Sequence, residues 1–168
     1  MAQGNGMIPD KVIELLQYRI NQEELSSRMY LAMSEWLDYN GYFGAAKLWA
    51  KYSSEELTHA RWAYTHLADH DILPKVQSIA DVKTDFESLI EIVYDSFKHE
   101  IDIANQCKKL VDVCMAEKDY ITVNLAYKYA NEQTEELAKL QKWIDRLATF
   151  GNNVTELREL DEEMGDAA

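Results

Sequence analysis

The stretch Ser53-Ser54-Glu55-Glu56-Leu57-Thr58-His59-Ala60 places a glutamate and a histidine three positions apart in the middle of a long helical segment. Residues three apart on a helix point to the same side, so Glu56 and His59 can bind one ion together. Both lie on the apolar stripe of the segment, where an unpaired carboxylate costs several kcal/mol. A single pair of this kind often arises by chance, so its meaning depends on the rest of the chain.

Three other helical segments each carry a polar residue near the midpoint of an otherwise apolar stripe: Glu23, Glu100 and Gln133. Antiparallel helices of similar length have their midpoints at one height, so these residues should meet Glu56 and His59 inside a four-helix bundle. A single glutamate at a core position is more often a member of a buried ion pair. Polar interruptions at one height on four helices favour a metal, and carboxylate and imidazole ligands suit iron.

A second group of acidic residues flanks the first: Glu55, Glu132, Glu135 and Glu136. Glu132 and Glu136 are four apart, where like charges destabilise a helix unless a cation lies between them. The group is therefore either a further cation site or a solvated acidic face. Tyr30 lies two turns after Glu23 on the same face, and we expect a packed core tyrosine within reach of the site.

The hydrophobic period and the positions of glycine and proline predict four long helices: about Pro9 or Asp10 to Tyr39, Gly44 to His70, Asp85 to Cys114, and a segment that follows the turn Glu117-Lys118-Asp119 and ends near Phe150. A short fifth helix is predicted from about Thr155 to Glu163, with Thr155 or Asn153 as its N-cap. Short links make the first two and the next two helices antiparallel hairpins, and the long middle link crosses the bundle from end to end. We therefore predict an all-α four-helix bundle with a short C-terminal fifth helix. We expect the fifth helix to pack on a neighbouring subunit, and docking on its own bundle is the alternative. Residues 1–168 form one domain, with flexible ends at 1–7 and 165–168.

Composition limits the function classes. The hydrophobic content of 47% suffices for a core, and the net charge of −13 argues against a nucleic-acid partner. No apolar run approaches the ~20 residues of a membrane span. Residues 1–6 lack the features of a signal peptide, so we expect a cytoplasmic protein. Cys107 and Cys114 lie seven residues apart on one helix, about 10 Å along its axis, which is too far for a disulfide.

Four stretches together resemble the non-haem ferritins of prokaryotes, over residues 8 to 163: Glu23–Ser27 with Tyr30, Ser54–His59, Glu100, and Asn131–Glu136. The resemblance implies a di-iron ferroxidase centre. Its first iron would be bound by Glu23, Glu56 and His59. Its second iron would be bound by Glu56, Glu100 and Glu136, with Gln133 close by and Tyr30 beside the centre. The resemblance also implies a third iron site, formed by Glu55, Glu132, Glu135 and Glu136.

The same resemblance implies a function. The subunit would oxidise Fe(II) with dioxygen or hydrogen peroxide, store the product as a ferric mineral, bind no haem, and assemble into a homo-oligomeric cage of about 24 subunits. Bacterioferritins and rubrerythrins fit less well, because their second Glu-x-x-His is Glu132-Gln133-Thr134-Glu135 here. Lys128 stands where several prokaryotic ferritins have a tryptophan. Two alternatives are a di-iron oxidase or peroxidase without mineral storage, and a purely structural bundle.

Overall fold

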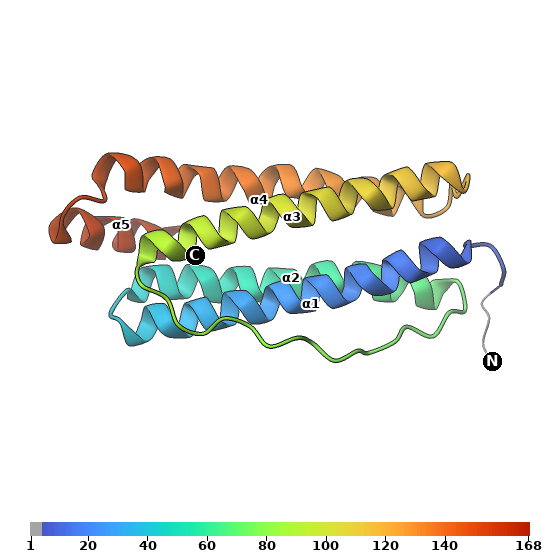
Figure 1. The fold of residues 1–168 in the computed structure, drawn as a ribbon, viewed down its shortest axis with the longest axis horizontal. Coiled ribbons are helices and arrows are strands. Elements are labelled where there is room, and N and C mark those ends of the chain that lie inside the picture. The colour runs from blue at the N-terminus through green and yellow to red at the C-terminus, as the bar shows by residue number, and fades with distance from the viewer. Residues whose placement is uncertain (1–4) are drawn as a thin grey trace.

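The computed structural model describes residues 5–168, which form five helices: α1 (Asp10–Tyr39), α2 (Phe43–Asp69), α3 (Leu89–Ala116), α4 (Val123–Phe150) and α5 (Val154–Ala167). The pairs α1–α2 and α3–α4 are antiparallel hairpins, and the extended segment between α2 and α3 runs along the bundle from one end to the other (Figure 1). The all-α four-helix bundle with a short fifth helix, predicted from the sequence, is confirmed.

Two helix boundaries lie about one turn from their predicted positions. Helix α3 begins at Leu89 rather than Asp85, because the Ser88 hydroxyl accepts a hydrogen bond from the Glu91 backbone N–H at 3.1 Å and so caps the helix. Helix α5 is capped by Asn153, whose side chain accepts from the Glu156 N–H at 2.9 Å. It continues beyond Glu163 to Ala167, through residues expected to form a flexible tail.

Two apolar clusters fill the ends of the bundle and leave a polar layer between them. Along α1, one cluster ends at Ile20 and the other begins at Tyr30, so Glu23 lies in the gap. The same gap occurs on the other three helices: between Tyr52 and Ala63 on α2, between Val93 and Ile103 on α3, and between Tyr129 and Leu140 on α4. The predicted metal ligands of all four helices fall in these gaps.

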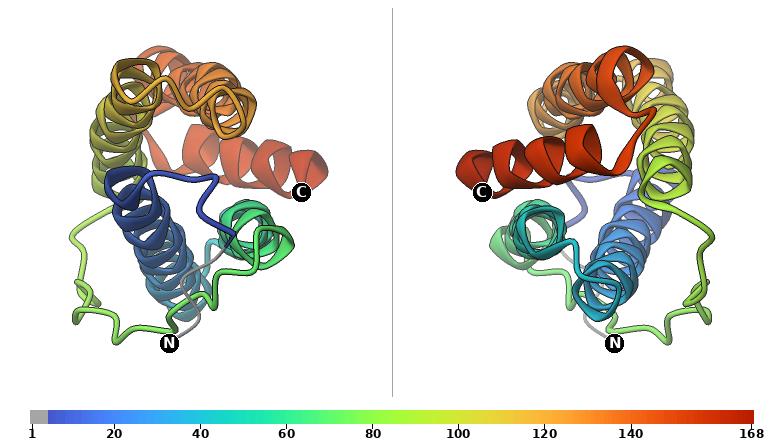
Figure 2. Two further views of the ribbon diagram at one scale, coloured as in Figure 1. Left: turned by 90° about the vertical axis from the view of Figure 1, so that its right-hand side faces the viewer. Right: turned by 90° about the vertical axis from the view of Figure 1, so that its left-hand side faces the viewer.

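Helix α5 docks on its own bundle, where it contacts α2 and α4 and crosses them at an angle (Figure 2). Leu160 and Met164 are buried in the core. The Asp161 carboxylate accepts hydrogen bonds from the N–H groups of Gly44 and Ala45, at 3.1 and 2.8 Å, and so caps the start of α2. Of the two predicted docking sites for this helix, the structure shows the one within the subunit.

Two further expectations from the sequence concern the cysteines and the membrane. Cys107 and Cys114 are both buried free thiols on α3, as the helical spacing predicted. Among residues 5–168, no helix combines the length and the apolar character that crossing a bilayer requires.

Candidate metal centre

The polar layer is deeply buried. Its members are almost inaccessible, with exposed fractions of 1% for Glu23, 4% for Glu56, 6% for His59, 1% for Glu100, 5% for Gln133 and 5% for Glu136. Each of the four long helices contributes at least one of them. A buried carboxylate needs a hydrogen bond, an ion pair or a metal, because transfer out of water is costly.

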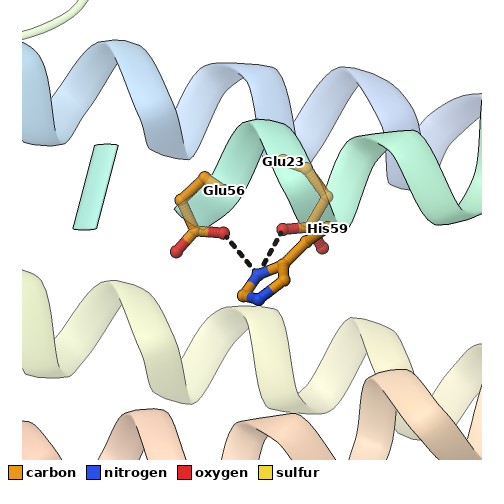
Figure 3. A group of neighbouring side chains, drawn as sticks. All are labelled: Glu23, Glu56 and His59. Carbon is orange, nitrogen blue, oxygen red and sulfur yellow. Dashed lines mark hydrogen bonds and ion pairs between the residues drawn. The ribbon is translucent and has the colours of Figure 1, made fainter. Parts of the chain in front are cut away.

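Glu23, Glu56 and His59 converge from α1 and α2 (Figure 3). The His59 Nδ1 atom lies 3.1 Å from Glu56 Oε2 and 3.7 Å from Glu23 Oε2. All three ligand atoms lie within 4.8 Å of one another. The spacing of three residues on α2 brings Glu56 and His59 to the same side, as predicted from the sequence.

The arrangement fits a metal ion. Glu23 Oε2 is buried and accepts no hydrogen bond, so one oxygen of the carboxylate lacks a partner within the described protein. Two donors that each bind one ion at about 2.1 Å lie no more than ~4.2 Å apart. The separations of His59 Nδ1 from the two carboxylates, 3.1 and 3.7 Å, meet this limit. Carboxylate and imidazole ligands suit iron, manganese or zinc.

Glu100 faces the same layer from α3. The Tyr30 hydroxyl donates to Glu100 Oε1. The amide nitrogen of Gln133, in the orientation that satisfies its neighbours, donates to Glu100 Oε2 at 2.9 Å and to the Glu100 backbone oxygen at 3.2 Å. Tyr30 and Gln133 thus hold the two oxygens of one carboxylate, and the aromatic ring lies beside the site as expected.

The opposite nitrogen of the histidine faces α4. His59 Nε2 lies 3.6 Å from Glu132 Oε1, and His59, Glu132 and Glu136 form a second group whose ligand atoms lie within 4.8 Å of one another. A histidine that binds a metal through one ring nitrogen commonly directs the other toward a carboxylate, which fixes the tautomer and the ring orientation. Glu132 is placed to do this.

Burial and neighbouring charges give the carboxyl groups different proton affinities. Burial, Glu23 and Glu100 raise the pKa of Glu56 well above its ordinary 4.5. Burial raises the pKa of Glu100 to about 7. Burial would also raise the pKa of Glu23, but Arg19 and His59 outweigh it and hold that pKa below 4.5. Neighbouring carboxyl groups of the metal-free centre therefore have pKa values shifted in opposite directions.

The histidine is cationic when no metal is bound. Burial alone would lower the pKa of His59, but the neighbouring carboxylates of Glu23 and Glu56 raise it to about 10. A metal ion that binds Nδ1 must displace this proton.

Arg19 is a residue of the site that sequence reasoning missed. It is 2% exposed and lies one turn before Glu23 on α1, with Nε 2.7 Å from Glu23 Oε1. Its NH1 group also contacts the Cys107 sulfur at 3.6 Å. The spacing of four residues between Arg19 and Glu23 was the available signal, because oppositely charged residues at i and i+4 on a helix attract each other.

The flanking acidic group does not gather as a whole. Lys139 lies within it, with Nζ 2.9 Å from Glu136 Oε1 and 3.5 Å from Glu55 Oε2. Glu135 is exposed and belongs to neither group of potential metal ligands. Lys139 was also missed from the sequence, although its spacing of three residues from Glu136 could have revealed it.

A tryptophan does lie beside the centre, on α2 rather than α4. The Trp62 ring lies 4.8 Å from the His59 ring, between centroids, and the Lys128 ammonium lies 3.7 Å from the centroid of Trp62. The lysine therefore covers the outer face of this tryptophan as a cation–π partner.

Comparison with known proteins identifies the family. Residues 13–150 match the family model described as the ferritin-like domain. The bacterial non-heme ferritin of Escherichia coli O6:H1 is 31% identical over 158 residues, which cover 94% of this chain and 96% of the relative. The probable bacterial non-heme ferritin-like protein of Haemophilus influenzae is 31% identical over 160 residues, covering 95% and 97%. The open pore ferritin of Archaeoglobus fulgidus superposes with a TM-score of 0.92 at 27% identity, covering 95% and 97%. The chain belongs to the ferritin family, as its motifs predicted.

Proposed function

We propose that this protein is the subunit of an iron-storing ferritin, and that it oxidises Fe(II) to Fe(III) in the polar layer of its own bundle. The observation that carries the proposal is the buried group of Glu23, Glu56 and His59, in which Glu23 Oε2 has no hydrogen-bond partner. A carboxylate oxygen left unpaired at 1% exposure is a costly feature unless a cation binds there.

The residues divide into two overlapping ligand sets. Glu23 and His59 bind the first Fe(II), and Glu56 lies between the two positions and serves both ions. Glu100 and Glu136 bind the second Fe(II), with Gln133 holding Glu100 in place. The four carboxylates carry a charge of −4 when ionised, which equals the charge of two Fe(II) ions and removes the repulsion that exists among them in the metal-free state.

Protons must leave as iron enters. His59, with a pKa of about 10, retains its proton at neutral pH without metal, and the raised pKa of Glu56 makes that carboxyl group harder to ionise. The Tyr30 hydroxyl keeps its proton, because burial and Glu100 raise its pKa well above 10, and it remains a donor to Glu100. The iron supplies the redox chemistry with dioxygen or hydrogen peroxide, and the protein supplies ligands and proton exchange.

Storage requires an assembly. Large apolar side chains are exposed on this subunit, among them Tyr39 at 89%, Val76 at 83% and Leu73 at 79%. Burial of such surface against other copies would stabilise an oligomer. We propose the cage of about 24 subunits that the family resemblance implies, in the cytoplasm, with the net charge of −13 drawing cations toward it.

The test is iron loading of the purified protein. Fe(II) is added without oxygen, bound iron per subunit is counted, and oxygen or peroxide is then admitted while ferric absorbance and particle mass are followed. A cage that fills with many iron atoms per subunit supports storage. Oxidation of bound iron without mineral or cage would favour a di-iron oxidase, and no bound iron would contradict both.

A further inference from the structure

The ammonium group of Lys139 lies between two carboxylates at the outer side of the centre. Its Nζ atom is 2.9 Å from Glu136 Oε1 and 3.5 Å from Glu55 Oε2. Glu55 Oε2 is a buried atom that accepts no hydrogen bond, so its contact with the ammonium is a charge interaction rather than a hydrogen bond. The Tyr52 ring also faces the ammonium, with its centroid 5.8 Å from Nζ.

A metal ion and this ammonium group compete for one gap. An ion bound by both Glu55 Oε2 and Glu136 Oε1 would need about 2 Å to each oxygen, and the ammonium group that already contacts both oxygens would stand close to it. Like charges at that distance repel each other strongly in a partly buried environment. The gap therefore holds either the lysine or an ion.

We propose that Lys139 takes the place of a third metal ion, so that each subunit binds two divalent ions at its centre and not three. The proposal rests on the proposed function for the first two ions. Lys139 neutralises Glu55 and Glu136 at the surface edge of the centre, and Glu136 keeps its second oxygen, Oε2, for an ion in the polar layer.

The neighbouring residues agree with this assignment. Glu135, which would complete a third set of ligands, is exposed and lies outside both groups of potential metal ligands. Glu132 faces His59 Nε2 at 3.6 Å. Without Lys139, Glu55 and Glu136 would form an anionic gap that a bound cation could neutralise.

The test counts ions. Metal-free protein is titrated with Fe(II) under argon, and with redox-inert Zn²⁺ in a calorimeter, and the number of tightly bound ions per subunit is compared between wild type and Lys139→Met. We expect two in wild type and three in the variant. Lys139→Arg keeps the cation and should still bind two. Lys142→Met is the matched control, because Lys142 lies on the same helix with its ammonium over the Trp143 ring, and it should also bind two.

Two further variants test the ion count independently of how well Lys139→Met folds. Lys139→Gln has no charge but a polar end, and it should gain the third ion even if the methionine variant folds poorly. Adding Glu55→Gln to Lys139→Met should return the count to two, because Glu55 is needed only by the third ion. Three ions in wild type, or two in both neutral variants of Lys139, would overturn the inference while leaving the proposed function intact. No ion in wild type would overturn both.

Discussion

The inner and outer sides of the centre each pair a carboxylate with a cationic side chain, but at different depths. On the inner side, Arg19 meets Glu23 at 2.7 Å with both side chains at most 2% exposed. On the outer side, Lys139 meets Glu136 at 2.9 Å, and the lysine side chain is 36% exposed. The two ion pairs have similar lengths and differ in access to water.

Depth determines what each cation does. Arg19 is 2% exposed, and its charge beside Glu23 holds the pKa of that carboxyl group below its ordinary value. Removal of either partner leaves the other charge buried and unpaired. Lys139 stands at the surface, so removal of this residue leaves carboxylates that water or a metal ion can reach. We therefore expect the inner cation to stabilise the fold, and we propose that the outer cation limits how many ions bind.

Among changes on the inner side of the centre, we expect Glu56→Ala to have the largest effect on Fe(II) oxidation. This change removes the carboxylate that we assign to both irons, and we expect rapid Fe(II) oxidation to fall by more than about a hundredfold. The fold should survive, since the pKa of Glu56 is well above 4.5 and the metal-free protein loses a group that burial disfavours in its charged form. Stopped-flow absorbance after mixing with oxygen measures the rate.

The control for this variant is Asp69→Ala, at the exposed end of the same helix. It should oxidise iron at the wild-type rate. Undiminished fast oxidation in Glu56→Ala, with the helical content of wild type, would show that the polar layer is not the site of oxidation.

The buried ion pair is tested by Arg19→Met. The change strands the Glu23 carboxylate in the core, and breaking a buried pair of this kind costs about 3–5 kcal/mol of unfolding free energy. Chemical denaturation of the metal-free protein measures the loss. Lys11→Met is the matched control, because Lys11 forms an ion pair of the same 2.7 Å length with Glu117 at a side-chain exposure of 73%, and it should change stability little.

The combined variant Arg19→Met with Glu23→Gln should recover most of that loss, because no unpaired charge remains. Arg19→Met should also lose less stability in acid than at neutral pH. The pKa of Glu23 is depressed in the fold, so the pair contributes stability above the unfolded value near 4.5 and loses it as pH falls. A uniform loss across pH would assign Arg19 a packing role only.

The helices and the buried polar layer between them could be predicted from the sequence for a simple reason. Polar residues at the midpoints of four apolar stripes leave few arrangements other than a common layer, and the link lengths fix the order of the helices. Hence the sequence predicted that Glu23, Glu56, His59 and Glu100 lie in one buried layer, and their role as metal ligands stays a prediction. The start of α3 was placed too early, because the cap at Ser88 competes with an equally plausible run of polar residues before it.

Arg19 and Lys139 were missed because the role of each depends on its contacts with side chains of other helices. Lys139 contacts Glu55 from another helix, and no spacing along the chain encodes that contact. Arginine is rarely buried unless it is paired, so burial of Arg19 could be expected only once its pairing with Glu23 was recognised. The sequence also grouped Glu135 with Glu132, although the structure leaves one exposed and brings the other to His59.

The number of protons released when metal binds distinguishes the inner side of the centre from the outer side. The pKa of His59 is raised from 6.5 to about 10, so its proton stabilises the metal-free fold below about pH 6.5, and this stabilisation is lost as pH rises through 10. Zn²⁺ binding must displace that proton, so affinity should rise about tenfold per pH unit for each proton released. Calorimetry in two buffers with different ionisation enthalpies counts the protons.

The expected pattern differs between variants. His59→Gln should release about one proton fewer, whereas Lys142→Met should release the same number as wild type, because the Lys142 ammonium lies over the Trp143 ring and contacts none of the proposed ligands. Equal proton counts in wild type and His59→Gln would contradict the cationic state of the histidine.

The smallest expected effect is the difference in metal affinity between variants of Glu132 and Glu135, which the sequence placed in one acidic group. Glu132→Ala removes the carboxylate 3.6 Å from His59 Nε2, so the ring loses the group placed to orient it, and metal affinity should fall by about 10-fold or somewhat more. Glu135→Ala alters an exposed residue on the same helix and should leave affinity and oxidation rate unchanged. Zn²⁺ titration of both variants, with helical content as the check on folding, makes the comparison. If Glu135→Ala instead loses a bound ion, then Glu135 turns inward when metal is present, and the outer side is a third metal site despite Lys139.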